Sequence, residues 1–291
     1  MSDDSSALRE IAAKLDQLAQ RSGEQSHWLW QSCQLLLASQ QATSLLLEDF
    51  LPATNPRYRD PLRLCATPGQ VFSQHNEDAI IAEIFRRIGI EHRTFLEIGA
   101  GDGSENTSRL LLELGWSGTW VEGAPEAAAT IRANFAGPIG QGRLTFQEAL
   151  LTAETVDEVV ASVDGDTLDY LAMDIDQNTY HIWKALDRLR PRVVCIEYNA
   201  SFPASVDWVA PYDPAKLWDG RNRFGASLKA MERLGEEKGY ALVGCDLRGV
   251  NAFFVRKDQD LALFAAPFTA ENHYEPPRYP MAGTAHRGHP S

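Results

Sequence analysis

The 291-residue sequence has few cysteines, and none of them are paired at metal-binding or redox spacing. The four are Cys33, Cys65, Cys195 and Cys245, and none forms a Cys-x-x-Cys motif. A disulfide-stapled domain or a cysteine zinc site would need such pairs, so both classes are excluded. We expect free thiols, as is usual in the reducing cytoplasm.

Long apolar runs and an excess of basic residues are also missing. No run approaches the ~20 apolar residues of a membrane-spanning helix, and residues 1–10 lack the apolar stretch of a signal peptide. Asp and Glu number 40 against 27 Lys and Arg, which gives a formal net charge of −13. Such a surface repels nucleic acids and anionic membranes. We therefore expect a cytoplasmic protein that acts on a small molecule, with neither nucleic acid nor membrane as a partner.

What the sequence does contain is a glycine-rich turn after a short apolar run. Residues 95–98 read as a buried strand, and Gly99, Gly101 and Gly103 follow at alternate positions before a helix-like run at 106–114. Glycine allows a tight turn and a close approach of the backbone to a ligand. This order predicts a nucleotide-sized pocket, and a tight turn without a ligand is the alternative.

Two acidic residues narrow the choice of ligand. Glu97 stands just before the first glycine, and Asp102 lies within the turn. A pyrophosphate prefers bare amides at a helix N-terminus, so these carboxylates would oppose it. S-adenosylmethionine (SAM) carries a sulfonium and an ammonium group and no phosphate. The motif therefore favours SAM over NAD as the cofactor.

From residue 94 onward, strand-like and helix-like segments alternate, which predicts a doubly wound, parallel α/β sheet. The strand candidates are residues 94–98, 118–122, 143–147, 168–174 and 192–198, and the helix candidates are 106–114, 125–135, 154–162, 178–189 and 225–238. Residues 240–245 and 251–256 flank a turn and predict a closing hairpin, so the last strand should be antiparallel to its neighbour.

The remaining segments predict the domain organisation. Residues 1–50 predict a helical extension of two helices that separate near Ser22 and Gly23. This extension either packs on the main domain or joins copies of the chain into a homo-oligomer. The proline-rich residues 51–72 predict a linker, residues 73–266 the cofactor-binding domain, and residues 267–291 an irregular tail with solvated histidines at His273, His286 and His289.

In an open parallel sheet the ligand lies beyond the carboxyl ends of the strands. Glu122 ends the second strand, where a carboxylate can accept both ribose hydroxyls; a solvated strand-end acid is the alternative. Gln147 and Glu148 end the third strand and are candidates for the adenine edge. The predicted cofactor residues are Glu97, Gly99, Gly101, Asp102, Glu122, Gln147, Glu148 and Asp174.

Four oxygen-bearing side chains follow the next two strands. Asp174 and Asp176 lie two residues apart, as do Glu197 and Asn199, so each pair would share a face of its strand. Oxygen ligands suit Mg²⁺, Mn²⁺ or Ca²⁺, which predicts a metal site of Asp176, Glu197 and Asn199 with Asp174 nearer the cofactor. The alternative gives these groups hydrogen-bonding and general-base roles.

Other polar residues near the carboxyl ends of the strands indicate a function less specifically. Asn178 is expected to cap the following helix. His181, one turn into that helix, is a candidate base or ligand, although a lone histidine is more often packed or solvated. The segment 73–78 predicts either a helix cap at Ser73 or a lid over the cofactor. Substrate recognition or packing is predicted for the loop that contains Trp208, Tyr212, Trp218, Arg221, Arg223 and Phe224.

These residues resemble a known family. Glu97-Ile-Gly-Ala-Gly-Asp-Gly103, Glu122 and the closing hairpin resemble the class I SAM-dependent methyltransferases. Ser73-Gln-His-Asn-Glu-Asp78 and Gly115-Trp-Ser-Gly118 are similar to the FkbM-like branch, and the resemblance covers about residues 73–257. It implies a Rossmann-like, seven-stranded sheet with the last strand inserted antiparallel. Glu97 and the glycines would then hold the methionine part of SAM, Glu122 the ribose, and Asp174 the amino-acid end or the substrate.

The resemblance also implies O-methylation of a sugar or natural product. Many related sequences have an acid-glycine pair after the fourth strand, whereas this chain has Asp174-Ile-Asp176. The extra acid suits a metal-assisted O-methyltransferase, with Asp174 and His181 as the candidate catalytic groups. Two other classes stay open: a non-catalytic SAM-binding scaffold assembled through the N-terminal helices, and an NAD-linked oxidoreductase.

Overall fold

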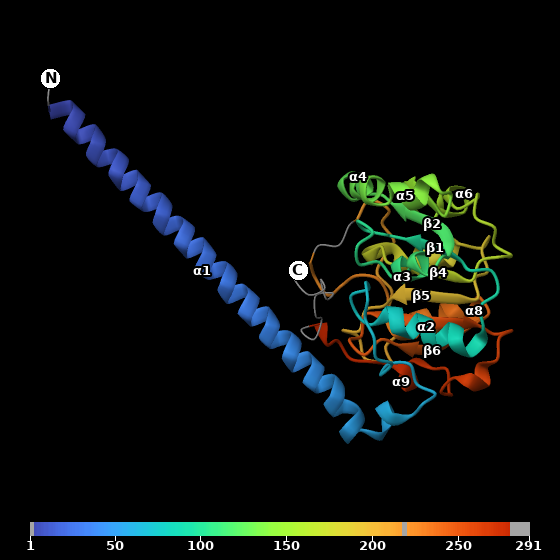
Figure 1. The fold of residues 1–291 in the computed structure, drawn as a ribbon. Helices are drawn as coiled ribbons and strands as arrows, with labels where there is room; N and C mark the ends of the chain where they lie inside the picture. Colours follow the sequence, from blue (N-terminus) through green and yellow to red (C-terminus); the bar gives the residue numbers. More distant parts are fainter. Residues whose placement is uncertain (1–2, 217–219, 280–291) are drawn as a thin grey trace. The chain divides into compact units, whose positions relative to one another are not determined.

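The computed structural model describes residues 3–216 and 220–279 (Figure 1). Its internal contacts divide the chain into two units, with the boundary between Leu47 and Glu48. The first unit is part of a single helix, α1 (Asp3–Thr54), and the second contains the sheet. Over the described ranges, none of the helices combines the length and the apolar character needed to cross a bilayer.

Helix α1 continues without interruption through Ser22 and Gly23, so the predicted break between two helices is wrong. A glycine inside a helix costs only about 1 kcal/mol relative to alanine. The flanking segments are rich in alanine, leucine, glutamine and glutamate, which favour the helix and outweigh that cost.

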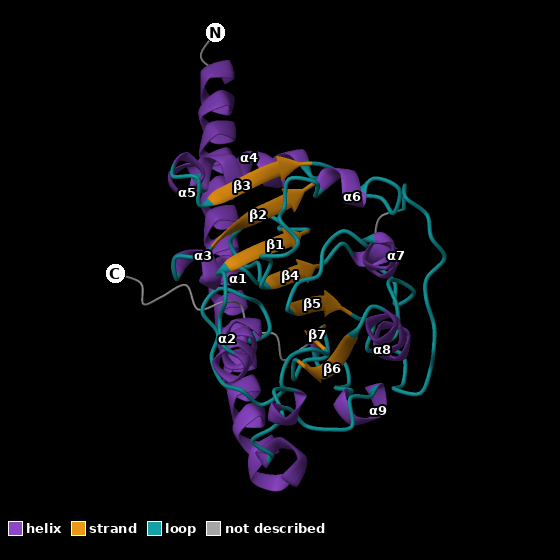
Figure 2. Cartoon of the chain, turned by 90° about the vertical axis from the view of Figure 1, so that its right-hand side faces the viewer, coloured by secondary structure: helices purple, strands orange, loops and turns teal. Residues whose placement is uncertain are grey.

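The second unit is built on one seven-stranded sheet with the strand order β3-β2-β1-β4-β5-β7-β6 (Figure 2). Its strands are β1 (Thr94–Ile98), β2 (Ser117–Glu122), β3 (Leu144–Glu148), β4 (Tyr170–Met173), β5 (Val193–Glu197), β6 (Tyr240–Cys245) and β7 (Asn251–Arg256). The first five strands pair in parallel, and β7 is antiparallel to both β5 and β6. This arrangement confirms the predicted Rossmann-like, doubly wound sheet with an antiparallel last strand.

Helices cover both faces of the sheet (Figure 2). One face packs against α2 (Glu77–Ile88), α3 (Arg109–Glu113), α4 (Pro125–Asn134) and α5 (Ala136–Gly140). The other packs against α6 (Val156–Val159), α7 (Thr179–Ala185), α8 (Leu228–Glu237) and α9 (Ala270–His273). The described residues of this unit also form three short 3₁₀ helices: η1 (Pro56–Arg59), η2 (Asp176–Asn178) and η3 (Leu261–Leu263).

Alternate residues of the central strands point to opposite faces, and both faces are apolar. On β4, Tyr170 and Ala172 join the cluster that includes α2 and α3, whereas Leu171 and Met173 join the cluster that includes α7 and α8. A strand buried on both faces is a continuous apolar run. Its first polar side chain therefore comes where the strand ends, at Asp174.

Residues 267–279 of the predicted tail belong to the folded second unit. Helix α9 forms in this segment, and its last residue, His273, is only 3% exposed. The expectation of a solvated histidine is therefore wrong at this position. His286 and His289 lie outside the described residues.

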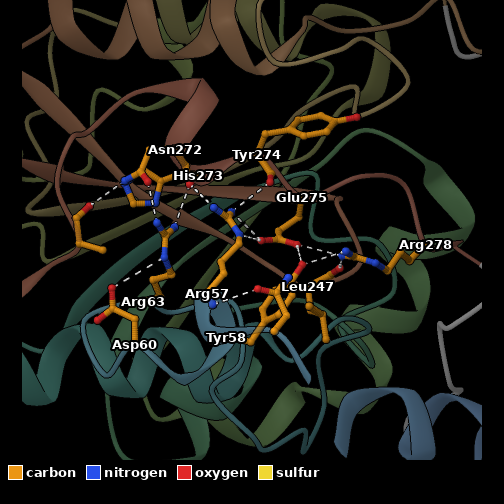
Figure 3. A network of polar contacts seen from close by, with 12 residues as sticks. Arg57, Tyr58, Asp60, Arg63, Leu247, Asn272, His273, Tyr274, Glu275 and Arg278 are labelled. Carbon is orange, nitrogen blue, oxygen red and sulfur yellow. Dashed lines mark hydrogen bonds and ion pairs between the residues drawn. The ribbon is translucent and has the colours of Figure 1, made fainter. Parts of the chain in front are cut away.

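A polar network fastens this C-terminal segment to η1 and its neighbours (Figure 3). Glu275 is fully buried, and its carboxylate accepts hydrogen bonds from Arg57 Nη2 at 2.8 Å, Tyr58 Oη at 2.9 Å and Arg278 Nη1 at 2.9 Å. Arg57 Nη1 also donates to the carbonyl oxygen of Asn272 at 2.6 Å. Because two arginines and a hydroxyl compensate the buried charge of Glu275, the network joins the two ends of the second unit.

Candidate functional site

A cavity of about 1020 Å³ opens at the carboxyl ends of the parallel strands. Its walls are the glycine turn after β1, the residues that follow β2, β3 and β4, and the segment before α2. The winding of the sheet reverses between β1 and β4. Doubly wound sheets bind their ligands at this switch point, so the cavity lies where the fold predicts a ligand.

The glycine turn needs its glycines for two different reasons. Gly99 has a φ of +83°, and a Cβ there would lie 1.8 Å from the carbonyl oxygen of Asp174. Gly103 has a φ of +82°, and a Cβ there would lie 2.7 Å from the ring of Phe135. By contrast, a Cβ on Gly101 would meet nothing within 4 Å. Gly99 and Gly103 therefore allow close packing, whereas Gly101 leaves open space at the cavity wall.

Glu97 holds the loop that follows the turn. This side chain is 4% exposed, and its hydrogen-bond partners are residues 106–108. Its two oxygens accept hydrogen bonds from the backbone amides of Thr107 and Ser108, from both hydroxyls, and from Asn106 Nδ2 at 2.7 Å. Burial raises the pKa of Glu97, and these donors oppose the increase. Glu97 thus acts on the cavity through the loop that it positions.

Asn106 is a cavity residue that sequence reasoning missed. Its Nδ2 is used by Glu97, whereas its Oδ1 is buried and has no partner among the described residues. Asn106 lines the cavity. Buried amide oxygens are normally satisfied, so this one favours a ligand that donates a hydrogen bond. The only sequence signal was its position at the start of the predicted helix.

Two acids of the predicted cofactor site shape the loops around the cavity. Glu122 accepts hydrogen bonds from the amides of Gly101, at 2.8 Å, and Ala124, at 2.7 Å. Asp102 accepts from the amide and hydroxyl of Ser104, and these bonds lower the pKa of Asp102. Both acids line the cavity.

The two predicted residues at the end of β3, Gln147 and Glu148, have partners outside the cavity. Gln147 Nε2 donates to Ser162 Oγ at 3.1 Å, and Glu148 pairs with Arg132 at 2.6 Å. Neither residue is part of the cavity lining; residues 149–151 (Ala-Leu-Leu) take that place. The wall next to Glu122 is therefore apolar.

Three carboxylates gather at the carboxyl ends of β4 and β5. One oxygen each of Asp174, Asp176 and Glu197 lies within 4.8 Å of the others. Asp174 opens onto the cavity, yet the protein around it and the charge of Asp176 raise its pKa to about 7. Burial and the charges of Asp174 and Asp176 raise the pKa of Glu197 well above its usual range, and burial also raises the pKa of Asp176.

The backbone around Asp176 is not the continuing strand that the prediction assumed. β4 ends at Met173, and Asp176 begins η2 with a left-handed φ of +53°. The premise of a continuing strand is therefore wrong. A turn returns Asp176 to the side of Asp174, and the predicted convergence of these two carboxylates is still found.

Two further candidates from the sequence, Asn199 and His181, do not line the cavity. Asn199 is fully buried: its Nδ2 donates to the carbonyls of Asn222 and Phe224, and its Oδ1 accepts from the amide of Ser201. His181 Nε2 lies 2.8 Å from the carbonyl oxygen of Ala210 and is not part of the cavity lining.

Asn178 occupies the N-cap position of α7, but its side chain makes no cap hydrogen bond. Its Nδ2 instead donates to the carbonyl oxygen of Asp213 at 2.9 Å. Asn178 and Asn199 both anchor the long segment between β5 and α8.

The segment before α2 contributes to the cavity wall. Gln74, His75 and Glu77 line the cavity, and Gln74 Nε2 donates to Glu105 Oε2 of the glycine loop at 2.8 Å. Ser73 is not the N-cap residue itself, because α2 begins at Glu77 and Asn76 occupies the N-cap position. Its Oγ nevertheless accepts a hydrogen bond from the amide of Asp78, in the first turn of α2, at 3.0 Å, and the Ser73 amide donates to Asp78 Oδ2 at 2.9 Å.

Aromatic residues of the segment between β5 and α8 have packing partners. Trp208 stacks on Phe202 at 4.4 Å between ring centroids, and Tyr212 packs 5.1 Å from the ring of His181. Lys216 and Pro214 of this segment line the cavity. Trp218 lies outside the described residues.

Comparisons with known proteins find similar solved structures. No family model and no curated protein matches the sequence. Among solved structures, an O-methyltransferase from Bacillus cereus in complex with S-adenosylhomocysteine (SAH) has 16% identity over 75% of this chain and 97% of its own, with a TM-score of 0.43. A SAM-dependent methyltransferase from Aquifex aeolicus has 11% identity over 62% of this chain and 90% of its own, with a TM-score of 0.38.

A sarcosine dimethylglycine methyltransferase candidate from Galdieria sulphuraria has 17% identity over 58% of this chain, with a TM-score of 0.38. This chain spans 62% of that protein's length. The strand order and the antiparallel β7 establish the fold of the second unit on their own.

Proposed function

We propose that this protein is a SAM-dependent methyltransferase of the FkbM-like branch, which methylates a hydroxyl group of a small molecule such as a sugar or natural product. The observation that carries the proposal is the charge of the cavity. Seven carboxylate residues line it: Glu77, Glu97, Asp102, Glu105, Glu122, Asp174 and Asp176. Lys216 is the only Lys or Arg among the described lining residues.

This charge favours a cationic cofactor over a phosphate-bearing one. A pyrophosphate would face carboxylates without arginine partners, which costs free energy, whereas a sulfonium and an ammonium group are attracted. The acidic lining therefore counts against the NAD-linked alternative. It agrees with the acids that flank the glycine turn in the sequence.

The residues of the cavity fit SAM. Glu122 would accept the ribose hydroxyls with the acceptor capacity that the amides of Gly101 and Ala124 leave on its carboxylate, because it lines the cavity beside the open space at Gly101. The unpartnered Oδ1 of Asn106 would accept from the ammonium group of the methionine part. The apolar residues 149–151 would face the adenine. When bound, SAM supplies an electrophilic methyl group on its sulfonium.

Asp174 and its neighbours would act on the substrate. Asp174 opens onto the cavity, and its pKa of about 7 suits a group that accepts a proton from a substrate hydroxyl. His181 lies against Ala210 and Tyr212, so we assign it no part in the reaction.

As an alternative, the carboxylates of Asp174, Asp176 and Glu197 would bind a divalent cation. Two oxygens that bind one ion lie at most about 4.2 Å apart for Mg²⁺ and about 5.2 Å apart for Ca²⁺. One oxygen each of Asp174, Asp176 and Glu197 lies within 4.8 Å of the others, which meets the limit for Ca²⁺, whereas Mg²⁺ would require them to move closer. Asn199 does not belong to the set, because its amide is used by its own loop.

Calorimetry and a transfer assay test the proposal. SAH should bind and NAD should not, and radiolabelled SAM should transfer its methyl group to hydroxylated acceptors. Binding of NAD without SAH would contradict the cofactor assignment. Binding of SAH without turnover on any acceptor would favour the scaffold alternative. EDTA should abolish activity, and Mg²⁺ or Mn²⁺ restore it, only if the carboxylates use a metal.

A further inference from the structure

Helix α1 has large apolar side chains that are exposed to solvent. Trp28 is 66% exposed, Leu29 56%, Trp30 61% and Leu36 70%. An exposed apolar surface of this kind marks an interaction site, because water contact with these groups is unfavourable. α1 therefore needs a partner along this part of its length.

The middle of α1 carries no charge. Gln25 to Leu47 are 23 residues without a single Asp, Glu, Lys or Arg, in a chain with a formal net charge of −13. Copies of an acidic protein repel one another wherever their charges meet. This stretch is where two copies can approach without that repulsion.

One stripe of α1 has the spacing of a helix–helix seam. Positions 29, 33, 36, 40, 43 and 47 recur at alternating intervals of four and three residues. They are Leu29, Cys33, Leu36, Gln40, Thr43 and Leu47. Upstream, positions 8, 11, 15, 18, 22 and 25 also alternate intervals of three and four, but two successive intervals of four, from 25 to 29 and from 29 to 33, separate this repeat from the stripe. They are Leu8, Ile11, Leu15, Leu18, Ser22 and Gln25. Apolar residues at this spacing are typical of a helix that packs along another helix.

We propose that α1 pairs in parallel and in register with α1 of a second copy of this chain, through the stripe from Leu29 to Leu47. In this arrangement Gln40 and Thr43 each meet their own counterpart, and polar groups at seam positions favour one register. An antiparallel pair centred on the stripe would instead place position 40 opposite position 36, a polar residue type opposite an apolar one.

A second copy also fits the chemistry of the stripe better than a membrane surface does. Helices that lie on anionic membranes use Lys and Arg on their polar face. The segment 25–47 has neither. The proposal is independent of the methyltransferase assignment, because it uses no residue of the cavity.

Cys33 makes the proposed register testable. It is the exposed cysteine of the chain, whereas Cys65, Cys195 and Cys245 are buried. A parallel, in-register pair brings the two Cys33 residues side by side, within the reach of a disulfide. Mild oxidation of the full-length protein with copper phenanthroline should therefore give a covalent dimer on a non-reducing gel. Cys33→Ser should prevent it.

A matched pair of variants tests the stripe itself. Leu29→Glu with Leu36→Glu puts two charges on the stripe, and Gln31→Glu with Ala38→Glu puts two charges, also seven residues apart, on the other side of the helix. Light scattering should give twice the 32.3 kDa chain mass for the wild type and the second variant, and the chain mass for the first. Circular dichroism should confirm that all three remain folded.

Several results would overturn the proposal. A wild-type chain that stays monomeric at all concentrations would show that α1 packs on its own second unit or remains alone. A monomer that floats with anionic vesicles would assign the stripe to a membrane. A dimer that does not cross-link through Cys33 would rule out the parallel register.

Discussion

A Cβ on Gly99 would lie 1.8 Å from the carbonyl oxygen of Asp174, so the turn after β1 and the end of β4 touch through backbone atoms. This contact lies between the two parts of the cavity, the glycine turn on one side and the carboxylates on the other. Any side chain at position 99 would have to push β1 and β4 apart where they pair in parallel.

Gly99→Ala should therefore disrupt both parts. We expect a loss of about 3 kcal/mol or more in the free energy of unfolding, from the steric overlap and the left-handed backbone together. Urea denaturation measures this change. Gly101→Ala is the control: it meets nothing within 4 Å and should cost only about 1–2 kcal/mol, yet weaken SAH binding by filling the cavity wall. Equal stability losses in the two variants would contradict this account.

Glu122→Ala should weaken SAH binding without unfolding the protein. The substitution removes a charged acceptor for the ribose and the group that holds the amide of Gly101. Hydrogen bonds to charged groups contribute about 1.5–3 kcal/mol, which corresponds to a roughly 10- to 100-fold increase in Kd by calorimetry. Glu148→Ala, at the end of the neighbouring strand, should leave Kd unchanged because Glu148 pairs with Arg132 outside the cavity.

Divalent cations should stabilise the carboxylate cluster. Mn²⁺ or Mg²⁺ would relieve the repulsion among Asp174, Asp176 and Glu197, and each 1 kcal/mol gained should raise Tm by about 2–4 °C. Asp176→Asn should remove this increase in a thermal-unfolding experiment. Asp102→Asn should keep it, since Asp102 bonds to Ser104 in another part of the cavity. An equal increase in all three proteins would indicate nonspecific cation binding.

His273 should make the protein sensitive to acid. Burial lowers the pKa of His273 from 6.5 to about 4, so the folded state resists protonation that the unfolded state accepts. The stability contribution is present above pH 6.5 and is lost as pH falls towards 4, by up to about 3 kcal/mol. His273→Gln should reduce the loss of stability between pH 6.5 and 4.5 in urea denaturation. His92→Gln, at an exposed position, should follow the wild type.

The strand pattern of the second unit was predictable because burial on both faces makes each central strand a short apolar run. The glycine turn and the strand-end acids Glu122 and Asp174 follow the same logic, since they come at the first positions where polar groups reach the cavity. The two acids Asp174 and Asp176 were predicted to converge, although a left-handed turn rather than a strand brings them together.

What the sequence could not show is which partner a polar side chain chooses. Asn199, His181 and Gln147 have the right residue types and approximate positions for a site, but nearby backbone and hydroxyl groups use them. The reverse holds for Asn106, whose unpartnered oxygen depends on how Glu97 orients its loop. Such pairings are set by tertiary contacts between segments far apart in the chain.

The bond between Arg57 and Glu275 has a consequence for biosynthesis. The two residues are 218 positions apart, so the second unit has to be synthesised almost to its described end before this pair can form. Until then Arg57, Tyr58 and Arg63 lack the acceptors that residues 272–275 supply. A released chain truncated before Glu275 would contain all seven strands but not these acceptors, and it should be cleaved by proteases more readily than the full-length protein.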